Sequence, residues 1–236
     1  MKKLLLALIS IALMSSCEDK KTPKNFVLNG NIKGLKKGTL YIQRIVDTTL
    51  VAIDTIKING DSQFVTEFDL KSPEMLYLFL DRGVSNSIDN NISFFAEEGT
   101  LKLETSLDFF TADVIITGSK NQELYDSYRK VISKYNNQDL DLVELKFKAY
   151  KEKNTIEVAK IQNKQDALLK TKYLYTTNFA VNNGDYEVAP YIAISDIYDI
   201  NLKYLDTIQK RMSPKVAKSL YGKKLTNYIA ERKKME

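Results

Sequence analysis

The sequence predicts an α+β protein, with an N-terminal antiparallel β-sandwich followed by a C-terminal all-helical domain. Up to residue 117, apolar residues recur at every second position in short runs between turn residues. From residue 118 onward they recur with the helical period of 3.6. The 236 residues are 44% hydrophobic and 28% charged, which is typical of a folded globular chain rather than a disordered one.

The first residues are typical of an export signal. Lys2 and Lys3 precede the apolar run Leu4–Met14. At about 1.5 Å per residue, this run covers only half of a roughly 30 Å hydrocarbon core, so it is too short to span a membrane. We therefore expect residues 1–16 to be a signal peptide.

Cys17 is the only cysteine of the chain, and it directly follows the expected signal peptide. The segment Met14-Ser15-Ser16-Cys17 resembles a bacterial lipobox, which implies that Cys17 is lipidated and becomes the mature N-terminus in the cell envelope, at the outer membrane. Two or three acyl chains would hold the protein there almost permanently, with residues 17–24 as a polar tether. An ordinary secreted protein with a chance cysteine is the alternative interpretation.

Residues 25–118 are expected to form the β-sandwich. The run Met75–Leu80 is apolar on both faces, which indicates a strand that is covered from both sides. We expect hairpins at Asn59-Gly60 and at Glu98-Gly99 because their residues are typical of tight turns. Eight strands are predicted, near residues 26–32, 40–42, 50–58, 64–70, 75–80, 92–97, 101–105 and 114–116.

Residues 119–236 are expected to form the helical domain. Ser119 and Gln122 have the spacing of a capping box, which predicts where the first helix begins. Near the other end of the chain, Gly222 is expected to end or kink the last helix. Helices are predicted from Ser119 to about Tyr135, near Leu142–Tyr150, over Thr155–Phe179, from Pro190 through Tyr198, over Leu202–Arg211 and from Pro214 onward.

The composition excludes several classes of chemistry. The chain has no histidine, so a Ser-His-Asp or Cys-His arrangement cannot be assembled in it. A lipidated Cys17 would also remove thiolate chemistry, and the sequence has no glycine-rich phosphate loop. A net charge of +5 is small for a nucleic-acid-binding protein. We therefore predict no cofactor, no nucleic-acid partner and no enzymatic activity.

Four carboxylates are the best candidates for a ligand site. They are Asp81, Asp89, Glu97 and Glu98, around the polar loop that begins at Asp81. Paired carboxyl groups can hydrolyse a glycosidic bond, and clustered carboxylates can bind calcium. The loop lacks the ligand spacing of an EF-hand, and a solvated loop with no ligand is the alternative.

Tyrosine is the other abundant functional side chain, with 14 residues in the chain. Many lie in the helical half, on the same stripes as leucine and isoleucine, so core packing explains most of them. Tyrosine also suits protein interfaces and glycan-binding surfaces, because it combines a large apolar ring with a polar hydroxyl.

Several short motifs follow one another in a fixed order, and together they resemble a known family. The motifs are Gly30-Asn31-Ile32-Lys33-Gly34, Gly38-Thr39-Leu40-Tyr41-Ile42, Asp54-Thr55-Ile56 before Asn59-Gly60, Phe94-Phe95-Ala96-Glu97-Glu98-Gly99-Thr100, and Gly118-Ser119 with Asn121. With these motifs, residues 25–125 resemble the domain of unknown function 4369, found in lipoproteins of Bacteroidota-type bacteria.

In that family the β domain commonly precedes a helical stretch and a thioredoxin-like domain with a Cys-x-x-Cys pair. Residues 190–234 resemble the helical stretch, and no residues correspond to the thioredoxin-like domain. The resemblance therefore implies an envelope lipoprotein that acts as a non-catalytic binding or scaffolding module for an envelope protein or a glycan. Two alternatives are an accessory subunit that serves a thioredoxin-like oxidoreductase in trans, and a carboxylate-dependent glycan hydrolase or glycan-binding protein.

Overall fold

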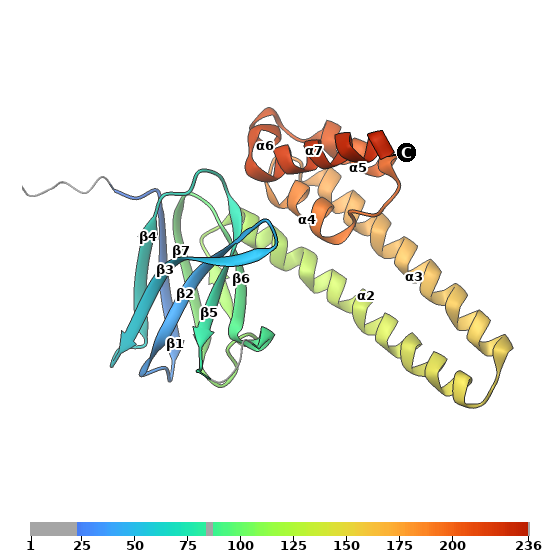
Figure 1. Cartoon of the computed structure of the whole chain (residues 1–236), viewed down its shortest axis with the longest axis horizontal. Coiled ribbons are helices and arrows are strands. Elements are labelled where there is room, and N and C mark those ends of the chain that lie inside the picture. Colours follow the sequence, from blue (N-terminus) through green and yellow to red (C-terminus); the bar gives the residue numbers. More distant parts are fainter. Residues whose placement is uncertain (1–22, 84–86, 236) are drawn as a thin grey trace, which may run out of the picture.

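The computed structural model describes residues 23–83 and 87–235, in which a β-sandwich is followed by six helices (Figure 1). The predicted α+β class is confirmed. The predicted signal peptide (residues 1–16), the candidate lipidation site Cys17 and most of the tether lie outside the described residues.

The sandwich consists of two four-stranded sheets, with strand orders β4-β1-β7-β8 and β3-β2-β5-β6. All strand pairs are antiparallel except β1 and β7, which run parallel. A short 3₁₀ helix, η1 (Ile88–Asn90), lies just before β6. The strands are β1 (Phe26–Lys33), β2 (Lys37–Val46), β3 (Thr49–Asn59), β4 (Gln63–Phe68), β5 (Glu74–Asp81), β6 (Asn91–Ala96), β7 (Gly99–Ser106) and β8 (Ile115–Thr117).

The two turns expected to form hairpins instead connect the two sheets. Asn59-Gly60 joins β3 to β4, and Glu98-Gly99 joins β6 to β7; in each case the two strands belong to different sheets. Gly60 and Gly99 do adopt positive φ, so the local turn chemistry was predicted correctly. The prediction of hairpin pairing was wrong because a turn reverses the chain without deciding which strand becomes its neighbour. Here β1 lies between β4 and β7 and pairs with both.

Strand β5 separates two hydrophobic cores. Leu76, Leu78 and Leu80 point into the sandwich, whereas Met75 on the opposite face packs into a second core with the helices. This arrangement confirms that the run Met75–Leu80 is covered on both sides. Phe95 on the neighbouring strand β6 also belongs to the second core, so the outer face of this sheet is the surface on which the helices pack.

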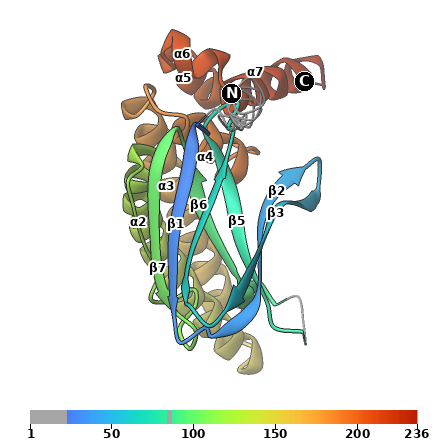
Figure 2. The ribbon, with the colours of Figure 1, turned by 90° about the vertical axis from the view of Figure 1, so that its left-hand side faces the viewer.

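The helices form one long hairpin and a compact group beside its base (Figures 1 and 2). Helices α2 and α3 make up the hairpin, whose far end extends away from the rest of the protein. Helices α4 to α7 pack around the base of α3 and near the sandwich. The helices are α2 (Lys120–Lys151), α3 (Thr155–Asn182), α4 (Val188–Asp196), α5 (Leu202–Arg211), α6 (Pro214–Lys218) and α7 (Leu220–Met235).

Two predicted helix boundaries were wrong. The first two predicted helices form the single helix α2, because no glycine or proline interrupts its 32 residues. The last predicted helix breaks at Ser219, between α6 and α7, rather than at Gly222. Pro190 does lie in the first turn of a helix, although α4 begins two residues earlier, at Val188.

Tyr128 connects three helices in the second core. Its hydroxyl donates a hydrogen bond to Asp196 Oδ2 at 2.8 Å and lies 3.1 Å from Thr176 Oγ1. Its ring stacks on that of Tyr175, with the ring centroids 6.2 Å apart. This buried side chain of α2 therefore orients the start of the hairpin relative to both α3 and α4.

Gly222 is required for the close approach of α6 and α7. A Cβ atom at this position would lie 2.0 Å from the carbonyl oxygen of Val216. We expect Gly222→Ala to lower the free energy of unfolding by about 3 kcal/mol, because the backbone of the preceding helix must move. Chemical denaturation measures this change. Lys223→Ala, at an exposed position of the same helix, is the control and should be nearly neutral. Equal stability of the two variants would contradict the prediction.

Candidate functional site

The structure does not bring the four predicted carboxylates together. Asp81 at the end of β5 and Asp89 in η1 lie beyond one end of β6, whereas Glu97 and Glu98 follow its other end. Six residues of strand, at about 3.3 Å each, separate the two pairs by roughly 20 Å. Within the described residues, no three His, Cys, Asp or Glu side chains are grouped so that they could hold a metal ion.

Glu97 lies at the start of α2 and acts as a cap. Its Oε1 accepts hydrogen bonds from the backbone N–H groups of Lys120 at 2.5 Å and Asn121 at 3.4 Å. A carboxylate is stabilised at this position because the N-terminal end of a helix carries partial positive charge. The structure therefore explains Glu97 by its contact with the helix. Glu98 lies beside it and accepts a 3.4 Å hydrogen bond from Asn25 Nδ2.

Asn121 links the sandwich to the helices through three hydrogen bonds. Its Nδ2 donates to Glu97 Oε2 at 2.7 Å and to Glu187 Oε2 at 3.1 Å, and its Oδ1 accepts from the backbone N–H of Val188 at 2.9 Å. Asn121, Glu187 and Val188 are all buried. One side chain in the first turn of α2 thus contacts the end of β6 and the start of α4.

Gln122 makes a second link between helix and sheet. The predicted capping box is only half formed: Ser119 Oγ accepts from the backbone N–H of Gln122 at 3.0 Å. The side chain of Gln122 does not complete the box, because its Oε1 accepts from the backbone N–H of Phe95 at 2.6 Å. This bond satisfies the backbone N–H of Phe95, a buried donor that pairs with no neighbouring strand. It also places the start of α2 against the outer face of the sheet.

A change in strand pairing opens a groove beside this junction. Strand β2 pairs with β5 only from Thr39 to Gln43, and its register with β3 shifts between Ile42 and Gln43. Such a shift indicates a bulge, which bends a strand away from its neighbour. The rest of β2 and the start of β3 (residues 44–52, the arm) therefore curve away from β5, as Figure 2 shows.

The space between the arm, β5 and the helices α4 and α7 is a hollow of about 380 Å³, which we call the tyrosine groove. Its lining is mostly apolar and aromatic, with a few charged groups at its margins. The lining residues are Ile45, Asp47, Glu74, Met75, Tyr77, Tyr191, Ile194, Ser195, Leu220, Tyr221 and Lys224.

Contacts among the aromatic rings keep the walls of the groove rigid. The Tyr191 ring packs edge-on against Phe95, Tyr125 and Tyr221, with ring centroids 4.9 to 5.9 Å apart. The hydroxyl of Tyr221 accepts a 2.9 Å hydrogen bond from the backbone N–H of Met75 on the free edge of β5. These contacts pack the aromatic rings of α4 and α7 against one another and against β5 and β6.

The groove has few charged groups, and its tyrosine hydroxyl groups are neutral. Burial raises the pKa values of Tyr77, Tyr191 and Tyr221, so these hydroxyls stay protonated at physiological pH. The buried carboxylate of Glu74 is neutralised by Arg44, whose guanidinium donates to both carboxylate oxygens at 2.6 and 2.9 Å. The groove thus presents apolar surface with hydroxyl groups and two further charged groups, the ammonium of Lys224 and the carboxylate of Asp47.

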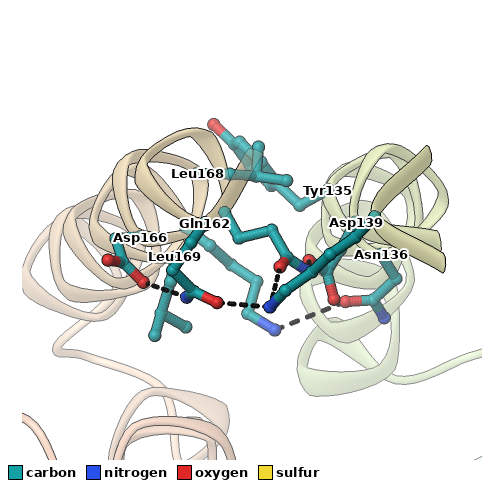
Figure 3. A pocket seen from close by; sticks show the side chains of 10 residues that line it. Tyr135, Asn136, Asp139, Gln162, Asp166, Leu168 and Leu169 are labelled. Carbon is teal, nitrogen blue, oxygen red and sulfur yellow. Dashed lines mark hydrogen bonds between the residues drawn. The ribbon is translucent and has the colours of Figure 1, made fainter. Parts of the chain in front are cut away.

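A second hollow, of about 250 Å³, lies between α2 and α3 and is polar (Figure 3). Lys146 extends across it and donates hydrogen bonds to the side-chain oxygens of Gln162 and Gln165. The amide of Gln165 in turn donates to Asp139 Oδ1 at 3.0 Å. These side chains bond mainly to one another, so this hollow is the polar seam of the helical hairpin and a weaker candidate for ligand binding than the tyrosine groove.

Sequence analysis identified the tyrosines but not the groove. Tyr191 and Tyr221 lie in the second core, as expected for tyrosines on apolar helical stripes, and they also form a wall of the groove. The apolar pairs Ile45-Val46 and Leu50-Val51, which break the alternation between two predicted strands, were the available signal for the arm. The groove itself needs the bulge in the β2–β3 pair, where Ile53 of β3 has no partner, and no local pattern predicts it.

Comparison with known proteins identifies one family. Residues 26–125 match the family model described as Domain of unknown function (DUF4369). This match covers the sandwich and the first turns of α2, including Asn121 and Gln122. No second family model, including that of a thioredoxin-like domain, matches the chain. No curated protein and no solved structure matches it. Among the described helices, none combines the length and apolarity needed to cross a bilayer.

The junction predicts a pH-dependent effect of Asn121→Asp. The new carboxylate would lie within hydrogen-bonding distance of Glu97 and Glu187 while buried, which raises the pKa of at least one of the three groups above its unfolded value. We expect a loss of about 3 kcal/mol of unfolding free energy at pH 7. The loss should shrink as the pH falls below that raised pKa, because the native state then binds the extra proton.

Chemical denaturation of the Asn121→Asp variant at pH 7 and at about pH 4.5, each against the wild type, measures this effect. Asn163→Asp, at an exposed position of α3, is the control and should be nearly neutral at both pH values. A loss of stability for Asn121→Asp that is the same at both pH values would contradict repulsion among carboxylates as its cause.

Proposed function

Residues 26–125 belong to the DUF4369 family of domains, and from that premise we propose that the protein is a non-catalytic binding module, held in the cell envelope by lipid on Cys17. The membrane would be the outer membrane, with the module facing the periplasm or the cell surface. The tyrosine groove, between the arm and the helices, is the observation that supports a binding role most directly.

We propose that the groove binds a polypeptide segment of an envelope partner that carries apolar side chains. Ile45, Met75, Ile194 and Leu220 supply apolar surface, and the tyrosine rings supply aromatic surface. Rigid aromatic walls with a few polar groups are typical of sites that bind an apolar anchor side chain. A glycan fits this lining less well, because its hydroxyl groups would lose hydrogen bonds against the aliphatic side chains.

The chemistry of the groove supports binding rather than catalysis. A catalytic base must be able to take up a proton near neutral pH, and the tyrosine hydroxyls remain protonated. Of the two carboxylates in the lining, that of Glu74 is engaged in a bidentate ion pair with Arg44, and that of Asp47 lies at an exposed position of the arm. The four carboxylates that sequence analysis considered for glycan hydrolysis lie in two separate places and outside this groove.

The proposed anchor predicts a modified N-terminus. Mass spectrometry of the mature protein, isolated from envelope membranes of its native host, should find an N-terminal Cys17 that carries acyl chains. Cys17→Ser should release the protein from the membrane fraction, because no other residue provides the thiol. An unmodified N-terminal peptide that begins at any residue other than Cys17 would contradict the proposal.

The proposed groove predicts position-dependent cross-linking. Ile45 and Val51 are both 43% exposed and lie on the arm, but their strand register places them on opposite faces. A photoreactive benzoylphenylalanine at position 45 should cross-link to a discrete polypeptide in envelope preparations of the native host, whereas the same group at position 51 should not.

Competition and mass spectrometry make the cross-linking test specific. An excess of unlabelled wild-type protein should suppress the adduct at position 45, and an excess of the Ile45→Asp variant should not. Tryptic peptides from the adduct should identify the same partner polypeptide in replicate experiments. Equal adducts at both positions, no adduct at position 45, or an adduct with a glycan would overturn the proposal of a polypeptide ligand.

A further inference from the structure

The distal half of the α2–α3 hairpin has a polar seam. Where two helices pack together, apolar side chains normally fill the seam between them. Here Asp139 and Lys146 of α2 face Gln162 and Gln165 of α3, and the four side chains form a hydrogen-bonded chain (Figure 3). Apolar burial contributes as well, because Ala149 of α2 and Ile161 of α3 are buried at this level.

The same part of α2 carries an apolar stripe away from the seam. Leu140, Val143, Phe147 and Tyr150 are spaced by three, four and three residues, so they lie on one side of the helix. All four are between 48% and 65% exposed. The hairpin extends away from the sandwich and from helices α4 to α7 at this level, and none of these elements covers the stripe (Figure 1).

An isolated helical hairpin would leave no such stripe exposed. The seam of this segment mixes polar and buried apolar side chains, whereas the stripe outside it has the heptad spacing typical of a helix that packs on another helix. A row of large apolar side chains on an otherwise charged helix indicates an interaction surface.

The charges beside the stripe favour a second copy of α2 in antiparallel orientation. The first half of the segment is acidic and the second half is basic. Outside the seam, two carboxylates give the first half a charge of −2, and three lysines with one glutamate give the second half +2. An antiparallel pair places each acidic half beside a basic half, whereas a parallel pair places like charges together. The acidic residues are Asp141 and Glu144, and the second half contains Lys148, Lys151, Glu152 and Lys153.

The spacing of the stripe fits the same orientation. The intervals of three, four and three residues are the same when read in either direction. Two antiparallel copies, related by a twofold axis between Val143 and Phe147, therefore place Val143 of each copy opposite Phe147 of the other. Leu140 then lies opposite Tyr150, so each layer pairs an aliphatic with an aromatic side chain. One self-complementary surface is what a twofold dimer requires.

We propose that the protein self-associates through this stripe, with the α2 helices of two copies packed in antiparallel orientation. The contact then joins the distal ends of the two hairpins. The groove and the sandwich of each copy stay outside the contact, so the proposal does not depend on the proposed ligand or on the lipid anchor. The short contact implies a dissociation constant in the micromolar range.

Sedimentation analysis of the full chain carrying Cys17→Ser tests the dimer, over protein concentrations from about 1 to 300 µM. We expect a reversible monomer–dimer equilibrium. Val143→Glu should weaken it at least tenfold, because a charge is then buried opposite Phe147. Leu145→Glu is the matched control: Leu145 is also 48% exposed, on the same helix, but lies on its other side.

Cross-linking between two cysteine variants tests the orientation. Leu140→Cys and Tyr150→Cys are made separately in the Cys17→Ser chain, so each protein has one thiol. Antiparallel packing predicts that mild oxidation links the two variants when they are mixed and links neither efficiently to itself. Parallel packing predicts the reverse.

Four results would overturn the proposal: a monomer at all concentrations, a dimer insensitive to Val143→Glu, equal loss of the dimer with Leu145→Glu, or self-linking of the single-cysteine variants. Thermal unfolding of each variant accompanies the test. The substituted residues are largely exposed, so the monomers should remain folded.

Discussion

The arrangement of this protein depends on the buried hydrogen bonds at the start of α2. Glu97 and Gln122 connect the first turn of the helix to the end of β6, and Asn121 extends this connection to Glu187 and Val188. Buried polar groups need partners with specific geometry, so this network permits few alternative orientations of helix and sheet. Apolar packing of Met75 and Phe95 under the helices supplies much of the remaining attraction.

The tyrosine groove is a consequence of that arrangement. In this sheet the helices pack on β5 and β6, while the bulge in the β2–β3 pair, at Ile53 of β3, bends the arm away from the same sheet. The two elements diverge, and the space between them is lined by side chains from both. A ligand in this space would contact the sandwich and the helices at once, so the relative position of the two parts determines the shape of the site.

The groove and the hairpin stripe lie in separate regions and differ in chemistry. The groove has aromatic walls and little net charge, whereas the stripe lies on a helical segment whose two halves carry opposite charges. These properties support two different kinds of contact, one with a foreign segment and one with another copy. An envelope protein with both surfaces could gather its partners by avidity, because each copy would present one groove.

Sequence analysis identified the strands, most helices and the change from strands to helices at residue 118, because these depend on local periodicity and turn chemistry. Met75–Leu80 was correctly interpreted as a strand with two buried faces. The errors concern features that periodicity does not encode. Asn59-Gly60 determines a chain reversal but not whether β4 pairs with β3 or with β1. The continuity of α2 likewise follows from the absence of a breaking residue, which changes in pattern around Asn136-Asn137 concealed.

The contacts of the candidate carboxylates were also not predictable from local sequence patterns. Glu97 was selected as a possible ligand because acidic residues stand close together in sequence, yet its partners are backbone groups of a helix that begins more than twenty residues later. The sequence by itself determined which face of each strand and helix is apolar, the α+β class and the positions of turns. Only the tertiary structure decided which faces meet, because burial and hydrogen bonding between segments far apart in the chain determine strand order, the divergence of the arm and the partners of each polar group.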